Sequence, residues 1–186
     1  MNHPSSDLCQ IDNAVLVLID IQTRLSAAMP QAVRAQVIKN ASILVQAASK
    51  LDIPLIVTRQ YPRGLGDTDP AIPTQTATTI DKTIFSCFRA DGFPQTLEQS
   101  ARRQIILAGM ESHVCVLQTA FDLLARNYRV FVAEDAVCSR TVANHRNAMT
   151  RMTQHGITLA STESILFEWL EDASHPQFKS ISCLIK

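Results

Sequence analysis

Apolar residues occur along the chain in short continuous runs that alternate with segments of helical periodicity. A run that is apolar at nearly every position is typical of a strand buried on both faces. Such runs predict strands at residues 14–20, 53–58, 104–108, 129–133 and 157–160, with a further short strand at 82–88. The periodic segments predict helices at residues 31–51, 94–100, 115–126, 143–155 and 162–170. This alternation predicts a three-layer α-β-α fold of the α/β class, whose central, mostly parallel sheet has about six strands.

The chain shows no internal repeat and no linker, so we expect residues 1–186 to form a single domain. Residues 1–12 are predicted to be a polar arm. The last segment, residues 175–186, carries apolar residues at helical spacing. We expect this C-terminal tail to dock on the domain or on another subunit.

Charge and hydropathy exclude several classes of partner. Lys plus Arg and Asp plus Glu number 17 each, whereas a nucleic-acid-binding protein calls for a basic face, so we expect no nucleic acid partner. No apolar run reaches about 18 residues, so no membrane partner is expected. The first residues lack the basic and apolar regions of a secretory signal, which predicts a cytoplasmic protein.

Three residues could carry chemistry, because the parallel sheet would bring them to one edge. Asp20 ends the first strand, Cys115 begins a helix after the 104–108 strand, and Lys82 could reach the same edge from a loop. Here Asp20 would be a general base, Lys82 would lower the thiol pKa, and Cys115 would be the nucleophile. Each also has an ordinary interpretation, as a cap, a solvated lysine and a small buried side chain.

Three segments together resemble the isochorismatase-like cysteine hydrolase family: residues 17–22, residues 82–86 and residues 109–120. Within that family, the loop at residues 60–66 and the C-terminal tail look closest to the isochorismatase-domain-containing subgroup. The resemblance extends from about residue 12 to the end, and it implies an Asp–Lys–Cys triad at Asp20, Lys82 and Cys115. The implied activity is thiolate attack on a small amide, carbamoyl or related C–N substrate.

The resemblance also implies a non-proline cis peptide bond between Met110 and Glu111. Such a bond would turn the Glu111 N–H toward the position of a developing oxyanion, beside the N–H of Cys115. These two donors would then stabilise negative charge on a substrate oxygen.

Three further residues are expected to bind a small-molecule substrate: Gln22, Tyr61 and Phe88. Gln22 lies two residues beyond Asp20, and a role in the structure of the loop stays open for it. Tyr61 lies in a loop rich in Gly and Pro, where an aromatic ring could line the site or anchor the loop. The neighbouring Phe85 is expected in the core.

The chain departs from the family's nicotinamidases, which carry metal-binding histidines after the second strand. Residues 58–64 contain no histidine, and the five histidines of the chain show no spacing that suggests a metal site. We therefore expect no metal and no cofactor, and a metal-dependent nicotinamidase-type amidase is disfavoured. A catalytically silent binding or scaffold protein stays open as an alternative. The family resemblance also leads us to expect a homo-oligomer.

Overall fold

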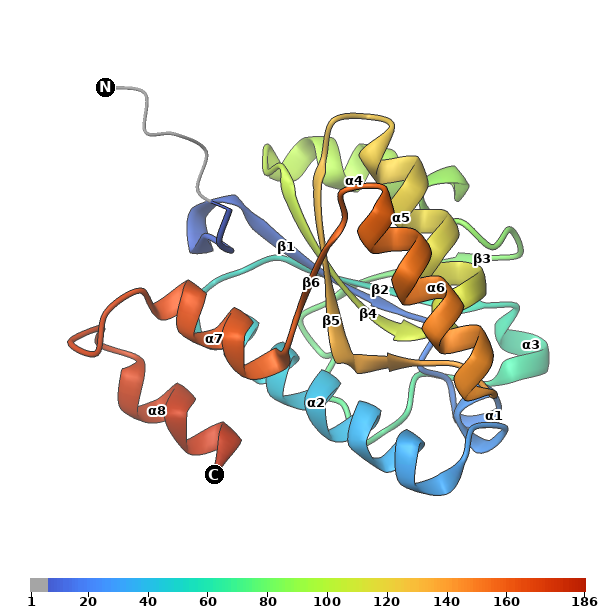
Figure 1. Ribbon diagram of the computed structural model, residues 1–186, viewed down its shortest axis with the longest axis horizontal. Coiled ribbons are helices and arrows are strands. Elements are labelled where there is room, and N and C mark those ends of the chain that lie inside the picture. The colour runs from blue at the N-terminus through green and yellow to red at the C-terminus, as the bar shows by residue number, and fades with distance from the viewer. Residues whose placement is uncertain (1–6) are drawn as a thin grey trace.

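A parallel sheet lies at the centre of the structure, a computed structural model that describes residues 7–186 (Figure 1). In these residues its strands are β1 (Ala14–Ile19), β2 (Leu55–Gln60), β3 (Thr78–Lys82), β4 (Gln104–Met110), β5 (Arg129–Cys138) and β6 (Thr158–Ala160). The strand order is β3-β2-β1-β4-β5-β6, and every neighbouring pair is parallel. The predicted α/β fold with a central parallel sheet is confirmed.

Helices cover both faces of this sheet (Figure 1). The α-helices of the described residues are α1 (Thr23–Ala27), α2 (Gln31–Lys50), α3 (Pro62–Leu65), α4 (Phe93–Ser100), α5 (Leu117–Leu124), α6 (Val142–Gln154), α7 (Thr162–Leu170) and α8 (Phe178–Ser182). Helices α2 and α7 pack on one face, and α4, α5 and α6 pack on the other. None of the helices in residues 7–186 is long and apolar enough to span a bilayer.

Strand β1 shows why its run is apolar at every position. Leu16 and Leu18 point into the core beneath α2 and α7, whereas Val17 and Ile19 point into the core beneath α4, α5 and α6. Since successive strand residues point to opposite faces, a central strand of a three-layer fold has no solvent-facing side. The strand is fully buried as a result.

Both ends of the described chain pack against this body. Of the predicted polar arm, residues 1–6 lie outside the described residues. Cys9 is buried, and its backbone N–H donates to the Glu168 carboxylate over 2.8 Å. In the C-terminal tail, Ile181 is buried in the core that α2 and α7 cover.

Several elements differ from their predicted positions, and two of these differences bear on the site. Strand β3 is Thr78–Lys82 rather than 82–88, because it is an edge strand with exposed polar residues and so lacks an apolar run. Helical geometry after β4 begins at Ser112, in a π-helical turn (Ser112–Val116) that leads into α5. Cys115 therefore lies inside this turn and not at the first residue of a helix.

Gly109 lets strands β1 and β4 approach closely at the end that carries Asp20. It pairs with Ile19 and has φ +135°, a region that favours glycine. A Cβ at this position would lie 2.0 Å from the carbonyl oxygen of Ile19, which is rigid backbone. The register of β1 and β4 therefore requires glycine, which has no side chain, at position 109.

We predict that Gly109→Ala lowers the free energy of unfolding by about 3–5 kcal/mol, the combined cost of an unfavourable φ and of overlap with backbone. Gly156→Ala is the matched control, since Gly156 has φ +83° but no heavy atom within 4 Å of the added Cβ. Its cost should be about 1–2 kcal/mol. Urea unfolding of both variants measures the difference, and equal losses would contradict the role of the close approach.

Candidate active site

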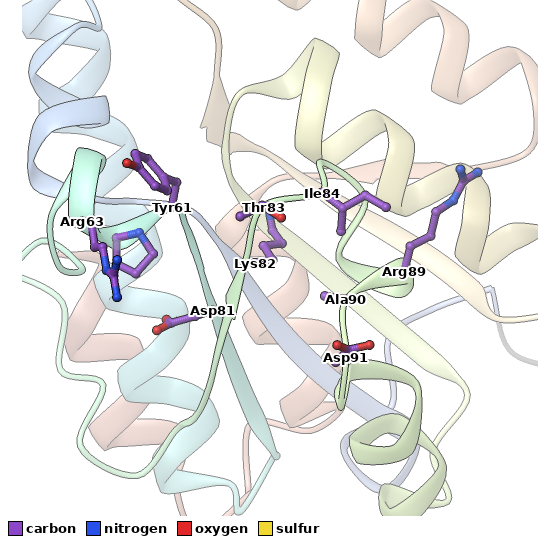
Figure 2. Close-up of a pocket in the computed structure, with 10 residues that line it drawn as sticks. Tyr61, Arg63, Asp81, Lys82, Thr83, Ile84, Arg89, Ala90 and Asp91 are labelled. Carbon is purple, nitrogen blue, oxygen red and sulfur yellow. The ribbon is translucent and has the colours of Figure 1, made fainter.

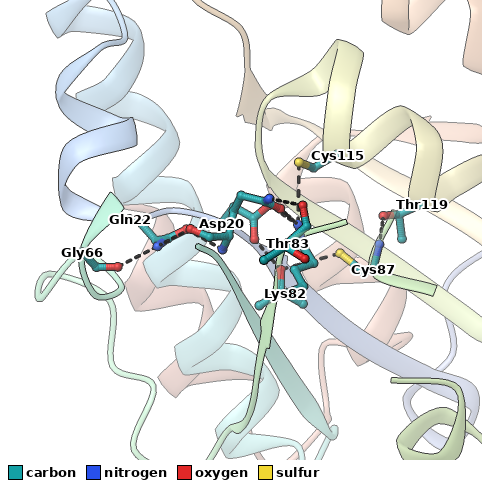
Figure 3. A network of polar contacts seen from close by, with 10 residues as sticks. Asp20, Gln22, Gly66, Lys82, Thr83, Cys87, Cys115 and Thr119 are labelled. Carbon is teal, nitrogen blue, oxygen red and sulfur yellow. Dashed lines mark hydrogen bonds and ion pairs between the residues drawn. The ribbon is translucent and has the colours of Figure 1, made fainter. Parts of the chain in front are cut away.

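The three residues predicted to carry chemistry meet at the carboxyl ends of the strands (Figure 3). Asp20 directly follows β1, Lys82 is the last residue of β3, and Cys115 lies in the π-helical turn after β4. Lys82 Nζ lies 2.6 Å from Asp20 Oδ2 and 3.7 Å from Cys115 Sγ. The structure therefore brings together side chains that are far apart in the sequence.

The ammonium group of Lys82 has an acceptor for each of its three protons. Besides Asp20 and Cys115, it donates to Gln60 Oε1 over 2.7 Å. The carboxylate of Asp20 is held in turn, because Thr58 Oγ1 donates to its Oδ1 over 2.8 Å. These hydrogen bonds fix the position of the Lys82 ammonium group relative to the Cys115 sulfur.

The ion pair between Lys82 and Asp20 is completely buried, with both side chains 0% exposed. Two charges removed from water are tolerated only when they are paired closely and hydrogen-bonded further, as these are. Burial is the largest single influence and disfavours the charged form of Lys82, but the Asp20 carboxylate and the Cys87 and Cys115 sulfurs together outweigh it, so the pKa of Lys82 is raised. The resting site therefore holds a charged ammonium group beside the thiol.

The thiol of Cys115 is held in its neutral form. Burial raises its pKa, the Asp20 carboxylate raises it further, and Lys82 acts in the opposite direction. The effect of Lys82 on the thiol pKa thus has the expected direction, but burial and the Asp20 carboxylate outweigh it. Cys115 is only 5% exposed, and this burial could not be inferred from its place in the sequence.

Sequence reasoning missed three residues of this network: Thr58, Gln60 and Cys87. Thr58 pairs with Ile19 and Gln60 pairs with Lys82 in the sheet, so β2 supplies both contacts from between β1 and β3. The sequence feature that could have identified them is the presence of polar residues at the carboxyl end of an apolar strand. Cys87 Sγ lies 3.6 Å from Thr58 Oγ1, and burial raises the pKa of this second thiol to about 11.

A cavity of about 550 Å³ opens beside Lys82 (Figure 2). Tyr61 lines it and is 55% exposed, and its expected contact with substrate stays a prediction. Gln22 is fully buried and serves the loop instead. Its amide nitrogen donates to the carbonyl oxygens of Gln60 and Gly66, and its oxygen accepts from the Gln60 N–H.

The two phenylalanines after Lys82 lie in other places than expected. Phe88, expected to bind substrate, is not among the residues that line the cavity and packs against the rings of Phe93 and Tyr128. Phe85, expected in the core, is 50% exposed. The reason is the earlier end of β3, which places residues 83–85 in exposed bends.

The Met110–Glu111 peptide bond is cis, as the resemblance implies. The Glu111 carboxylate accepts hydrogen bonds from the backbone N–H and the Nε of Arg140, at 2.9 and 3.1 Å. His113 does not reach the network around Lys82, since its ring nitrogens contact Ser139 and Asn144. These contacts attach the turn around Cys115 to the segment between β5 and α6.

In residues 7–186, no group of three or more His, Cys, Asp or Glu side chains is arranged to hold a metal ion. The donors nearest the candidate site are Asp20, Cys87 and Cys115. Asp20 is already engaged by Lys82 and Thr58.

We predict that Lys82→Met lowers the free energy of unfolding by about 3–5 kcal/mol at pH 7, because it leaves the Asp20 carboxylate buried without a partner. Because the pKa of Lys82 is raised in the folded state, its stabilising contribution is complete below the ordinary value of 10.5 and is lost at higher pH. The deficit of the variant should therefore shrink above pH 10.5. Urea unfolding across pH measures it, and a deficit independent of pH would contradict the pairing.

This chain is similar to known proteins of one family. Residues 14–164 match the Isochorismatase domain family. Isochorismatase domain-containing protein 2A of Mus musculus is 37% identical over 176 residues, which cover 94% of this chain and 84% of that protein. The solved structure of MAR1 ribonuclease from Caenorhabditis elegans is 35% identical, with a TM-score of 0.89 over 96% of this chain and 92% of that one.

A more distant structure shows the same fold. The ycaC gene product of Escherichia coli, described as an octameric hydrolase of unknown specificity, is 20% identical, with a TM-score of 0.90 over 98% of this chain and 91% of that one. The family match covers most of the chain, and a relative above 30% identity spans nearly all of it. The chain therefore belongs to the isochorismatase-domain family.

Proposed function

We propose that the protein is a cysteine hydrolase that attacks a small amide, carbamoyl or related C–N substrate with Cys115. Family membership supports a hydrolase in general terms. The observation that carries the cysteine route is the buried chain of contacts from Asp20 through Lys82 to the Cys115 sulfur, next to an open cavity. A nucleophile, a proton acceptor and a fixed positive charge are the parts that acyl transfer requires.

In the first half of the proposed reaction, the Cys115 sulfur bonds to the substrate carbonyl carbon while its proton passes to the Asp20 carboxylate. The raised pKa of Cys115 makes this transfer necessary, because little thiolate exists beforehand. The tetrahedral intermediate then collapses. Its C–N bond breaks, the proton held by Asp20 goes to the leaving nitrogen, and an acyl-enzyme thioester remains.

In the second half, water attacks the thioester carbon and gives its proton to Asp20. The C–S bond breaks, and that proton returns to the sulfur, so the site is restored and one water has been consumed. Lys82 keeps its charge throughout, and it offsets the negative charge that moves between the carboxylate and the sulfur. The hydrogen bond to Gln60 keeps the ammonium group in place during these steps.

The substrate oxygen needs donors as negative charge develops on it. We assign these to the backbone N–H groups of Glu111 and Cys115. The Glu111 N–H donates no hydrogen bond within residues 7–186 and so is available to a substrate. The hydrogen bonds from Arg140 to the Glu111 side chain fix this residue, and a donor fixed in advance stabilises an oxyanion without reorganisation.

We predict that Cys115→Ala abolishes turnover in a screen of small amides and carbamoyl compounds. Asp20→Asn should reduce kcat by about 10²–10⁴-fold, since it keeps the shape but removes the proton acceptor. Cys183→Ala is the control and should keep full activity, because Cys183 is an exposed thiol of the C-terminal tail.

Acid quenching during turnover, followed by mass spectrometry, should find the acyl group on the peptide that contains Cys115. Full activity of Cys115→Ala would contradict the proposed attack by the Cys115 sulfur. An intact protein that hydrolyses nothing in the screen would favour the binding or scaffold alternative. Stoichiometric zinc or iron in the purified protein would instead favour a metal-dependent amidase.

A ribonuclease is the second candidate, because a relative with 35% identity is named as one. The charge of this chain disfavours it, since 17 basic and 17 acidic side chains leave no excess positive charge for phosphates. We predict weak RNA binding at 150 mM salt, measured by fluorescence anisotropy on a labelled single strand. Tight binding that weakens steeply with salt, together with cleavage lost in Cys115→Ala, would replace the amide hydrolase proposal.

We also propose that the protein forms a homo-oligomer. The support is the octameric relative from Escherichia coli, which shares the fold at 20% identity. Exposed apolar side chains at Val33 and Val142 beside a second cavity give this chain surface that a subunit contact could cover.

A further inference from the structure

Several charged side chains line the cavity beside Lys82, and only some of them are paired with another charge in the protein. Besides Lys82, these charged residues are Arg63, Asp81, Arg89 and Asp91. A charge that is already paired within the protein interacts only weakly with a ligand. An unpaired charge in a concave wall can recognise a group of opposite sign.

Two of the four are already neutralised. Asp81 accepts two hydrogen bonds from Arg59, at 2.7 and 3.0 Å. Arg89 donates two to Asp122, at 2.7 and 3.1 Å, and Figure 2 shows its guanidinium group directed away from Lys82. These are two-point pairs between planar groups, which leave both members engaged.

Arg63 and Asp91 are the unpaired members. Within residues 7–186, neither side chain makes a hydrogen bond or an ion pair. They lie on opposite sides of Lys82 (Figure 2). The wall therefore presents a free positive charge on one side of the candidate reaction centre and a free negative charge on the other.

The backbone that carries each of these charges is fixed. Arg63 belongs to α3, and hydrogen bonds tie the segment around it at both ends. The Tyr61 N–H donates to the Lys82 carbonyl oxygen over 2.8 Å, and Gln22 donates to the Gly66 carbonyl oxygen over 2.6 Å. Arg24 also donates to the carbonyl oxygen of Gly64, so the turn has little freedom.

Asp91 is fixed by its neighbours in the chain, because Ala90 and Phe93 on either side are buried. It does not cap α4, since Gly92 is the cap residue and no side-chain hydrogen bond closes that end. A structural role at the helix end therefore does not account for this carboxylate.

We infer that the cavity selects a small zwitterionic amide, whose carboxylate binds Arg63 and whose ammonium group binds Asp91. Because these two residues lie on opposite sides of Lys82, the charged groups of the ligand would flank its amide, which would lie beside Lys82. This inference rests on the proposed function for the reaction that follows, but the recognition itself is a binding property. A cavity of about 550 Å³ has ample room for a molecule of amino-acid size.

Four small amides that differ in charge test this inference: N-methylacetamide (neutral), N-acetylglycine (anionic), glycine N-methylamide (cationic) and glycylglycine (zwitterionic, with its amide between the two charges). Calorimetry on Cys115→Ser measures their affinities without turnover. Glycylglycine should bind at least about tenfold more tightly than N-methylacetamide, with the two singly charged amides between them. Equal affinity across the series, or no binding of glycylglycine, overturns the inference.

Variants of Arg63 and Asp91 show which charged group of the ligand each side chain binds. Arg63→Gln should weaken binding of glycylglycine and N-acetylglycine by about five- to tenfold and leave glycine N-methylamide unchanged. Asp91→Asn should weaken binding of glycylglycine and glycine N-methylamide by the same factor and spare N-acetylglycine. Lys39→Gln, which removes an exposed charge from α2, is the control and should change nothing. If Arg63→Gln and Asp91→Asn change all four affinities alike, the inference fails.

Turnover by the native protein separates this inference from the proposed function. Hydrolysis of N-methylacetamide as efficiently as glycylglycine would keep the cysteine hydrolase and overturn the zwitterion preference. The predicted order of affinities without hydrolysis of any amide would keep the recognition and remove the proposed activity.

Discussion

The site depends on one buried ion pair, between Lys82 and Asp20. Both side chains are fully removed from solvent and lie 2.6 Å apart. Neither charge could be buried alone, since an isolated ion in the interior costs several kcal/mol. The pair therefore holds the ends of β1 and β3 in a fixed relation, and it places both a proton acceptor and a positive charge beside the Cys115 sulfur.

The sheet makes this pairing possible. Strand β2 lies between β1 and β3, and its carboxyl end supplies the hydroxyl of Thr58 and the amide of Gln60, which satisfy the rest of the ion pair. On the other side of β1, Gly109 allows β4 to approach β1 closely, and the chain after β4 carries Cys115. Acidic, basic and nucleophilic groups thus come from three strands whose carboxyl ends share one edge, where open α/β sheets bind ligands.

The sequence predicts the central strands well and the edge poorly, for a physical reason. Strand β1 is apolar throughout because both of its faces are buried, whereas β3 exposes Thr78, Thr79 and Asp81 and so carries no apolar run. Asp20 and Cys115 could be proposed from their places after strands. The state of the Cys115 thiol could not, because its raised pKa depends on the depth of burial and on the distance to a carboxylate.

We propose that Cys115 rests as a neutral thiol whose proton passes to Asp20 during the reaction. Titration of Cys115, followed by the pH dependence of iodoacetamide labelling at this residue, tests this proposal most directly. Labelling should rise only well above pH 9 in the native protein, and the thiol pKa should be lower in Asp20→Asn, which removes the carboxylate that raises it while Lys82 remains beside the sulfur. Rapid labelling of the native protein at neutral pH, or no change in Asp20→Asn, would contradict it.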